Sequence, residues 1–160
     1  MRLRDKIAIV VGAGQTSGET IGNGRATALL FAREGARVML VDRDLESARE
    51  TQRMIEKEGG DAWAFEADIV HEDRCRALAL ACRDRHGRID VLHCNVGIGT
   101  GDDGVTRLEE AAWARIMDVN LKGPFLTCKH VIPVMREQQG GCITMVSSIA
   151  AVASAGIVAY

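Results

Sequence analysis

Four glycines near the start of the chain have the spacing of a phosphate-binding turn. Gly12 and Gly14 follow an unbroken β-prone apolar run that begins at Lys6, and Gly22 and Gly24 open a segment with helical periodicity. Glycine lets a backbone turn tightly and approach a ligand, while the first turn of a helix presents free N–H groups and the positive end of its dipole. A strand, a glycine turn and a helix in this order indicate a site for a dinucleotide pyrophosphate.

An acidic residue follows these glycines at the distance expected for a ribose contact. A second apolar run, residues 37–41, ends in Asp42, 20 residues after Gly22. A carboxylate there accepts hydrogen bonds from ribose hydroxyls and repels a 2′-phosphate, which favours NAD over NADP. The neighbouring Arg43 is a residue type that accommodates this phosphate, so NADP is the alternative. Asp42 also suits an ordinary turn after a strand.

The glycine turn, defined here as residues 12–24, is longer than the compact form. Ten positions separate Gly12 from Gly22, and residues 15–20 form a polar insertion between them. We expect this insertion to lie beside the pyrophosphate.

The composition of the chain excludes several classes of protein. Its 160 residues suit one domain over residues 1–160, and 47% hydrophobic residues with only two prolines argue against disorder. A net charge of −2 gives no reason to expect nucleic acid or an anionic membrane as a partner. Because no apolar run reaches about 18 residues and the first strand starts almost at once, we expect neither a membrane span nor a signal peptide.

The cysteines match no metal site and no redox pair. Their number is odd and their spacing fits neither a zinc site nor a CxxC motif. We therefore expect no metal, and reduced, mostly buried thiols in a cytoplasmic protein. The five are Cys75, Cys82, Cys94, Cys128 and Cys142.

Strand and helix patterns alternate along the whole chain. This alternation predicts an α/β fold with a parallel sheet, helices on both faces and right-handed crossovers. The predicted strands cover residues 6–11, 37–41, 61–66, 89–93 and 142–146. The predicted helices cover a segment ending at Gly35, then residues 45–58, 71–86 and a long stretch from 106 to about 139.

The last of these helices has three local signals. Thr106 and Glu109 have the spacing of a capping box, which predicts a helix start there. Asn120 is a poor helix former and predicts a bend, whatever its chemistry. Pro133 should bend the helix or remove one backbone hydrogen bond.

Ligands of such sheets bind at the carboxyl ends of the strands. The chain places its unusual polar and glycine residues at these ends, which is the strongest indication of a functional site. Besides Asp42 and the glycine turn, they are Asp68, Asn95, Gly97, Ser147 and Ser148.

The order of these motifs resembles that of the classical short-chain dehydrogenases/reductases, over all 160 residues. The glycine turn is similar to the family's cofactor loop, apart from the insertion. Asp68-Ile69 resembles the acid and aliphatic pair that contacts adenine. Cys94-Asn95-Val96-Gly97 resembles the family's Asn-Asn-Ala-Gly sequence, from which Cys94 and Val96 depart. The cofactor contacts implied are Gly12, Gly14, Gly22, Gly24, Asp42, Arg43, Asp68, Ile69, Asn95 and Gly97.

The resemblance continues into the segments that carry the family's catalytic residues. Val119-Asn120-Leu121 resembles the segment of the active-site asparagine, and Met145-Val-Ser-Ser148 the strand end of the catalytic serine. Tyr160 lies 12 residues after Ser148, close to the family's spacing. The implied fold is a Rossmann-like doubly wound parallel sheet in three α/β/α layers. The implied protein is a homo-oligomer that acts on a small alcohol or ketone.

The implied chemistry is hydride transfer between a nicotinamide and an alcohol or carbonyl carbon. Tyr160 would exchange a proton with the substrate oxygen, and Ser148, favoured over Ser147 by its spacing, would bond that oxygen. Asn120 would hold a water and keep its helix bent.

The chain departs from the family at its last residue, Tyr160. The family's lysine, four residues further on, and its last two strands are absent from these 160 residues. An unassisted tyrosine has a pKa of about 10, so about one in a thousand would be ionised at neutral pH. We therefore expect a complete cofactor site beside an incomplete general base.

Two other functions stay open. One is a dinucleotide-binding module without turnover. The other is a methyltransferase using S-adenosylmethionine, which also joins a glycine turn to an acid after the second strand but needs neither Ser148 nor Tyr160.

Overall fold

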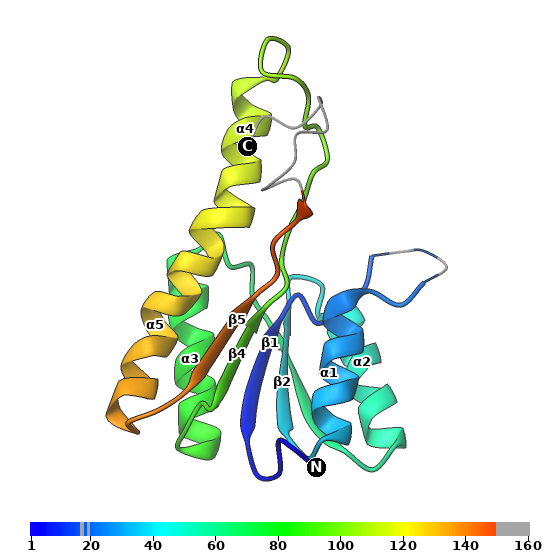
Figure 1. The fold of residues 1–160 in the computed structure, drawn as a ribbon, viewed down its shortest axis with the longest axis vertical. Coiled ribbons are helices and arrows are strands. Elements are labelled where there is room, and N and C mark those ends of the chain that lie inside the picture. The colour runs from blue at the N-terminus through cyan, green and yellow to red at the C-terminus, as the bar shows by residue number, and fades with distance from the viewer. Residues whose placement is uncertain (17, 19, 150–160) are drawn as a thin grey trace.

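A five-stranded parallel sheet forms the centre of the computed structural model, which describes residues 1–16, 18 and 20–149. The strands are β1 (Ile7–Val11), β2 (Arg37–Asp42), β3 (Asp61–Glu66), β4 (Val91–Cys94) and β5 (Cys142–Met145). Their order is β3-β2-β1-β4-β5, so β1 is central (Figure 1). Val11 lies beside Val41 on β2 and Cys94 on β4, which brings the carboxyl ends of these strands level. The predicted parallel sheet is confirmed.

Helices cover both faces of this sheet because side chains alternate along each strand. Ala8 and Val10 of β1 pack with the helices of one face, while Ile9 and Val11 pack with those of the other. The three predicted layers are thus confirmed (Figure 1). One face carries α1 (Asn23–Arg33) and α2 (Leu45–Lys57), and the other carries α3 (Glu72–His86) and α5 (Gly123–Glu137).

The helix predicted from the capping box begins later than expected. Helix α4 spans Glu110–Met117, so Thr106 caps nothing. The N–H groups of Arg107 and Leu108 both donate to the carbonyl of Gly104 and fold these residues into a turn. The capping-box prediction is therefore wrong, because this turn uses the N–H groups that a helix start would leave open.

A π-helical turn, η1 (Asp118–Lys122), joins α4 to α5. It contains Asn120, where a bend is predicted, and the structure places a π-helical turn at this position. Pro133 lies within α5, which continues past it to Glu137. A π-helical turn closes over five residues instead of four, and such turns frequently occur at functional sites.

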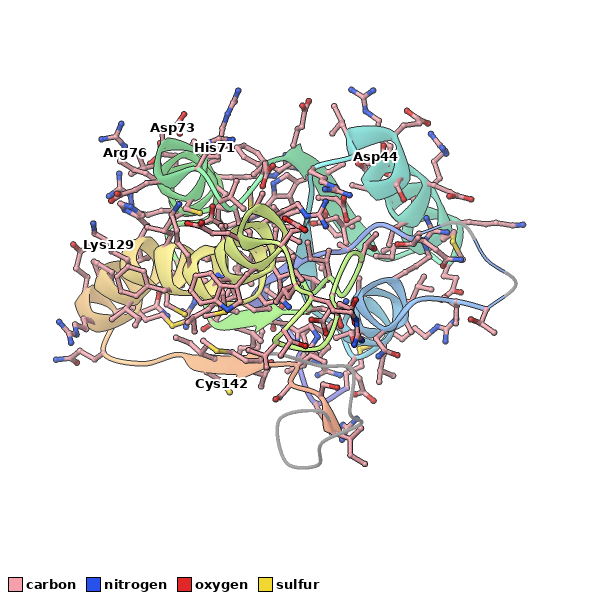
Figure 2. The ribbon with its side chains drawn as sticks, turned by 90° about the horizontal axis from the view of Figure 1, so that it is seen from above. Asp44, His71, Asp73, Arg76, Lys129 and Cys142 are labelled. Atoms are coloured by element: carbon pink, nitrogen blue, oxygen red, sulfur yellow. The ribbon has the colours of Figure 1, made fainter. Side chains whose placement is uncertain are left out.

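The cysteines are all free thiols, and four of the five are buried, as predicted. Burial raises the pKa of Cys82 and that of Cys94 to about 12. These two thiols therefore stay protonated and unreactive at neutral pH. Cys142 is exposed on the edge strand β5 (Figure 2). No helix in the described part of the chain is long and apolar enough to cross a membrane.

Candidate functional site

A cavity of about 650 Å³ opens at the carboxyl ends of β1, β2 and β4. Its size lies within the range of about 300–1,000 Å³ that is typical of small-molecule sites. All ten residues predicted to contact a cofactor line this carboxyl-edge cavity. They are Gly12, Gly14, Gly22, Gly24, Asp42, Arg43, Asp68, Ile69, Asn95 and Gly97.

The glycine turn forms one wall of the cavity, and two of its glycines are required by geometry. Gly12 has a φ of +78°, in the left-handed region. A Cβ on Gly24 would overlap the carbonyl oxygen of Gly12 and lie 2.8 Å from Nδ2 of Asn95. Helix α1 therefore starts directly against the backbone of the turn, which only glycine permits.

Gly22 differs from its neighbours. A Cβ at this position would meet nothing within 4 Å. Packing therefore gives no reason for a glycine at Gly22, whereas a ligand in the adjoining cavity would. Gly22 is the N-cap of α1 and carries no capping side chain, and the first turn of α1 holds no acidic residue. This helix start favours an anion.

The polar insertion is folded by the side chain of Gln15. Its Oε1 accepts a hydrogen bond of 3.0 Å from the N–H of Gly22, and its Nε2 donates one of 2.9 Å to the carbonyl of Thr20. Gln15, Thr16 and Thr20 all line the carboxyl-edge cavity. These residues of the insertion thus border the cavity, and its place beside a pyrophosphate stays a prediction.

Asp42 lies at the end of β2 with both carboxylate oxygens bonded to the backbone. Oδ2 accepts from the N–H of Gly14 at 2.9 Å, and Oδ1 from the N–H of Asp44 at 3.0 Å. The carboxylate is therefore held in one orientation at the cavity wall. Arg43 is exposed beside it.

The asparagines after β4 and in η1 shape the opposite wall. The N–H of Asn95 donates to the carbonyl of Val11 at 2.9 Å, which extends the strand pairing by one residue. The Asn120 side chain accepts from the N–H of Ile98 at 2.8 Å and donates to its carbonyl at 2.9 Å. Asn120 therefore acts on the cavity through Ile98, which lines it. Its predicted water contact stays a prediction.

Of the three predicted catalytic residues, the two that the structure describes, Asn120 and Ser148, do not line this cavity. Asn120 lies behind Ile98, and Ser148, like Ser147, is exposed three residues or fewer beyond the end of β5. Neither serine is among the residues that line the cavity. Tyr160 lies outside the described residues.

Sequence reasoning missed the polar residues that support the glycine turn from α2. Ser47 and Thr51 both bond the backbone of residues 13–15. The available signal was their spacing of four residues, which places both on one helix face just after Asp42.

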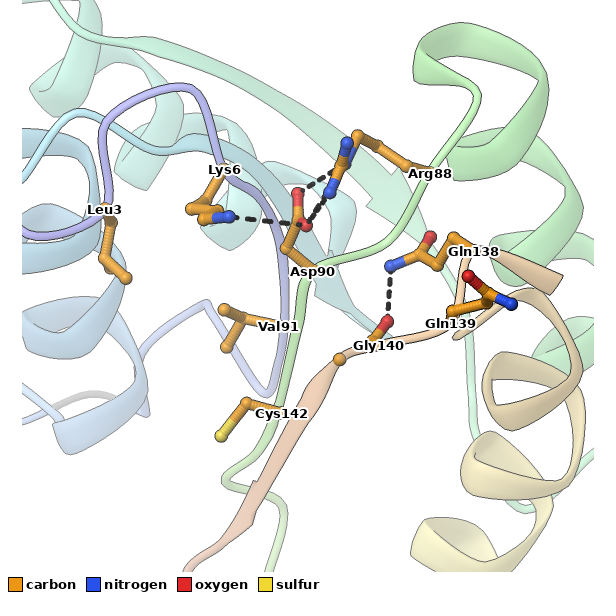
Figure 3. Close-up of a pocket in the computed structure, with 10 residues that line it drawn as sticks. Leu3, Lys6, Arg88, Asp90, Val91, Gln138, Gln139, Gly140 and Cys142 are labelled. Carbon is orange, nitrogen blue, oxygen red and sulfur yellow. Dashed lines mark hydrogen bonds and ion pairs between the residues drawn. The ribbon is translucent and has the colours of Figure 1, made fainter. Parts of the chain in front are cut away.

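A second cavity, of about 460 Å³, lies at the amino ends of β4 and β5 (Figure 3). None of the predicted site residues lines it. At its centre the carboxylate of Asp90 accepts hydrogen bonds from Arg88 and, at 2.9 Å, from the N–H of Ile7. Burial raises the pKa of Asp90, but these bonds and the charges of Arg88 and Lys6 outweigh burial and hold it below its ordinary value. This group joins β1 to β4.

No three His, Cys, Asp or Glu side chains within the described ranges lie close enough together to hold a metal ion.

Comparison with known proteins found similar sequences and similar structures. The family model for short chain dehydrogenases matches residues 6–160. An uncharacterized oxidoreductase of Bacillus subtilis, YxbG, is 38% identical over 92% of this chain and 52% of its own length. A short-chain dehydrogenase/reductase structure from Burkholderia xenovorans matches 98% of this chain and 62% of its own, with a TM-score of 0.93 and 39% identity.

A third similar protein was solved with ligands. It is a 7α-hydroxysteroid dehydrogenase complexed with NADH and 7-oxo glycochenodeoxycholic acid. It matches 96% of this chain and 57% of its own, with a TM-score of 0.87 and 32% identity. The chain spans about half the length of the curated relatives it matches.

Proposed function

Since this chain belongs to the short-chain dehydrogenase family, we propose that it binds NAD in the carboxyl-edge cavity and belongs to an oxidoreductase acting on a small alcohol or ketone. The observation that carries the proposal is the convergence of all ten predicted cofactor residues on one cavity. The similar hydroxysteroid dehydrogenase that was solved with NADH and an oxo steroid supports both the cofactor and the substrate class.

The residues of the cavity fit a nicotinamide dinucleotide. The space that Gly22 leaves open and the close contact at Gly24 suit a pyrophosphate at the start of α1. Asp42 would accept hydrogen bonds from the adenosine ribose, and its charge favours NAD over NADP. Asp68 and Ile69 would contact the adenine. When bound, the nicotinamide supplies or accepts the hydride.

Three residues are proposed to act on the substrate side. Asn120 would hold the loop after β4 through its two bonds to Ile98. Ser148 would donate a hydrogen bond to the substrate oxygen, and Tyr160 would exchange a proton with that oxygen.

We further propose that residues 1–160 form one domain of a cytoplasmic homo-oligomer. The single sheet supports one domain, and the free thiols support a reducing compartment. Large apolar side chains left exposed on α4, η1 and α5 support self-association. They are Trp113, Leu121 and Phe125.

The first test is cofactor binding by the chain. Titration of NADH, followed by its fluorescence, is expected to saturate with a Kd below about 1 mM. S-adenosylmethionine is expected not to compete. Binding of S-adenosylmethionine without binding of NADH would refute the proposal. Binding of NADH with no oxidation of any secondary alcohol in a panel would instead favour a binding module without turnover.

Asp42→Asn tests the preference for NAD. The amide keeps the size of the side chain but removes the charge that repels a 2′-phosphate, so the ratio of NADPH to NADH affinity is expected to rise about tenfold. Asp44→Asn is the matched control, because Asp44 is exposed at the same cavity wall and asparagine caps a helix as well as aspartate does. Equal shifts in both variants would contradict the role of Asp42.

A further inference from the structure

A chain of buried polar contacts lies behind the glycine turn. Arg25 on α1 is only 6% exposed, and its Nε donates to Oγ1 of Thr51 on α2 at 2.9 Å. Its Nη2 donates to Glu50 at 2.8 Å and to the carbonyl of Ser47 at 3.2 Å. Neither Arg25 nor Thr51 lines the carboxyl-edge cavity. A buried guanidinium is costly to desolvate, and apolar residues of similar volume often stabilise a fold equally well.

The far end of this chain of contacts is the backbone of the turn. Thr51 is fully buried, and its hydroxyl donates to the carbonyl of Ala13 at 2.8 Å. Because Arg25 already donates to this hydroxyl, the single hydroxyl proton goes to a carbonyl. The carbonyl of Ala13 at 2.8 Å is a closer acceptor than the carbonyl of Ser47 at 3.3 Å, so the hydroxyl donates mainly to Ala13.

One peptide plane connects this donor to the predicted ribose contact. The carbonyl of Ala13 and the N–H of Gly14 belong to the same planar group and point in opposite directions. Thr51 holds the carbonyl side, and the N–H side donates to Oδ2 of Asp42 at 2.9 Å. Any rotation of this peptide therefore moves the donor that orients the Asp42 carboxylate.

Ser47 holds the next peptide from the same helix face. Its Oγ accepts from the N–H of Gln15 at 2.7 Å and lies 3.3 Å from the carbonyl of Gln15. A Cβ on Gly14 would lie 2.7 Å from this Oγ, so the turn is pressed against α2 without space to rearrange.

We propose that Thr51 is a positioning residue for cofactor discrimination. Through the Ala13–Gly14 peptide it sets the orientation of Asp42, and thereby the discrimination between NAD and NADP. This inference rests on the proposed function, since it assumes that a dinucleotide occupies the cavity. Thr51 touches no part of the cavity itself and acts only through the turn.

The test compares two substitutions at Thr51 by their Kd values for NADH and NADPH. Thr51→Val removes the hydroxyl at nearly constant volume. It is expected to raise the Kd for NADH about tenfold, with a much smaller effect on NADPH, so that the discrimination falls. Thr51→Ser retains the hydroxyl and is expected to keep both Kd values within about twofold of the native ones.

Thr127→Val is the matched control for lost stability. Thr127 is also fully buried, but its hydroxyl bonds the carbonyl of Gly123 within α5 at 2.9 Å. This variant is expected to unfold at a lower temperature and to keep the native ratio of the two Kd values. If Thr51→Val does not fold, the ratio of the two Kd values is measured in Ser47→Ala instead. Ser47 is half-buried and lines the carboxyl-edge cavity, and loss of its hydroxyl is expected to reduce discrimination about threefold by freeing the N–H of Gln15.

Failure of the inference is distinguishable from failure of the proposed function. A native ratio in folded Thr51→Val, or in Ser47→Ala when only that variant folds, would overturn the positioning role alone. A native chain that binds neither dinucleotide would overturn the proposed function and this inference with it.

Discussion

Gly24→Ala is expected to raise the Kd for NADH at least about a hundredfold and to lower the free energy of unfolding by about 3 kcal/mol. A Cβ there would overlap the carbonyl oxygen of Gly12 and come within 2.9 Å of its carbonyl carbon. These are backbone atoms, which cannot turn aside as a long side chain does. Helix α1 must therefore shift away from the turn and take the N–H groups of its first turn with it. Titration with NADH and chemical denaturation measure the two effects.

Substitutions at two other glycines distinguish a loss of packing from a loss of ligand contact. A Cβ on Gly22 or on Gly140 meets nothing within 4 Å. Gly22→Ala is expected to cost less than about 1 kcal/mol of stability but to weaken NADH binding, because the methyl group enters the carboxyl-edge cavity. Gly140→Ala, outside that cavity, is expected to leave NADH affinity unchanged. Native NADH affinity in Gly24→Ala would contradict this account of the turn.

Asp90 lies at the other end of the sheet, and Asp90→Ala is expected to lower the free energy of unfolding by about 3 kcal/mol. Asp90 is only 8% exposed, and its carboxylate accepts a hydrogen bond from the N–H of Ile7. It also bonds the guanidinium of Arg88 (Figure 3). Its removal leaves a buried N–H without its acceptor and a cation without its partner. Denaturation with urea measures the loss, and NADH affinity of the folded fraction should not change.

Asp61→Ala is the control for the loss of one carboxylate. Asp61 pairs with Arg37 at 3.6 Å, and both side chains are more than half exposed. Such a surface pair contributes about 0–1 kcal/mol. A comparable loss of stability in Asp61→Ala and Asp90→Ala would contradict the role of Asp90 in joining β1 to β4.

The pH dependence follows from the direction of the shift at Asp90. Its pKa is lower in the folded chain than the value of about 3.9 expected when unfolded. The stabilisation from its ionised form is therefore complete above about pH 4 and is lost as the pH falls through the folded pKa. Asp90→Asn is expected to lose less stability than the native chain on acidification below pH 4. An identical loss of stability below pH 4 in the native chain and in Asp90→Asn would be evidence against this pKa shift.

The wall of the carboxyl-edge cavity was predictable because a parallel sheet collects the ends of its strands. Gly12 and Asn95 directly follow strands β1 and β4, and Asp42 ends strand β2, which lies beside β1. The periodicity that locates a strand therefore also locates the residue after it. This argument needs no knowledge of side-chain orientation.

The support behind the cavity was not predictable in this way. Thr51 and Arg25 are polar residues on helices, and the sequence pattern does not distinguish a buried polar residue from one on a solvated face. Leu30 illustrates the converse, since it is an apolar residue on helix α1 and is 47% exposed. Local motifs were equally uncertain, because the turn at Gly104 overrode the predicted cap at Thr106.

The π-helical turn η1 has a consequence for the direction in which side chains point. One residue of an α-helix advances the side-chain direction by about 100°, so one extra residue in a turn rotates everything after it by that angle. Asn120, within η1, reaches Ile98, and the buried face of α5, with Val131 and Met135, meets the sheet after the turn. In a regular α-helix, Asn120 and the apolar side chains of α5 could not both point in these directions. The extra residue in η1 therefore lets one continuous helical segment place Asn120 against Ile98 and the apolar side chains of α5 in the core.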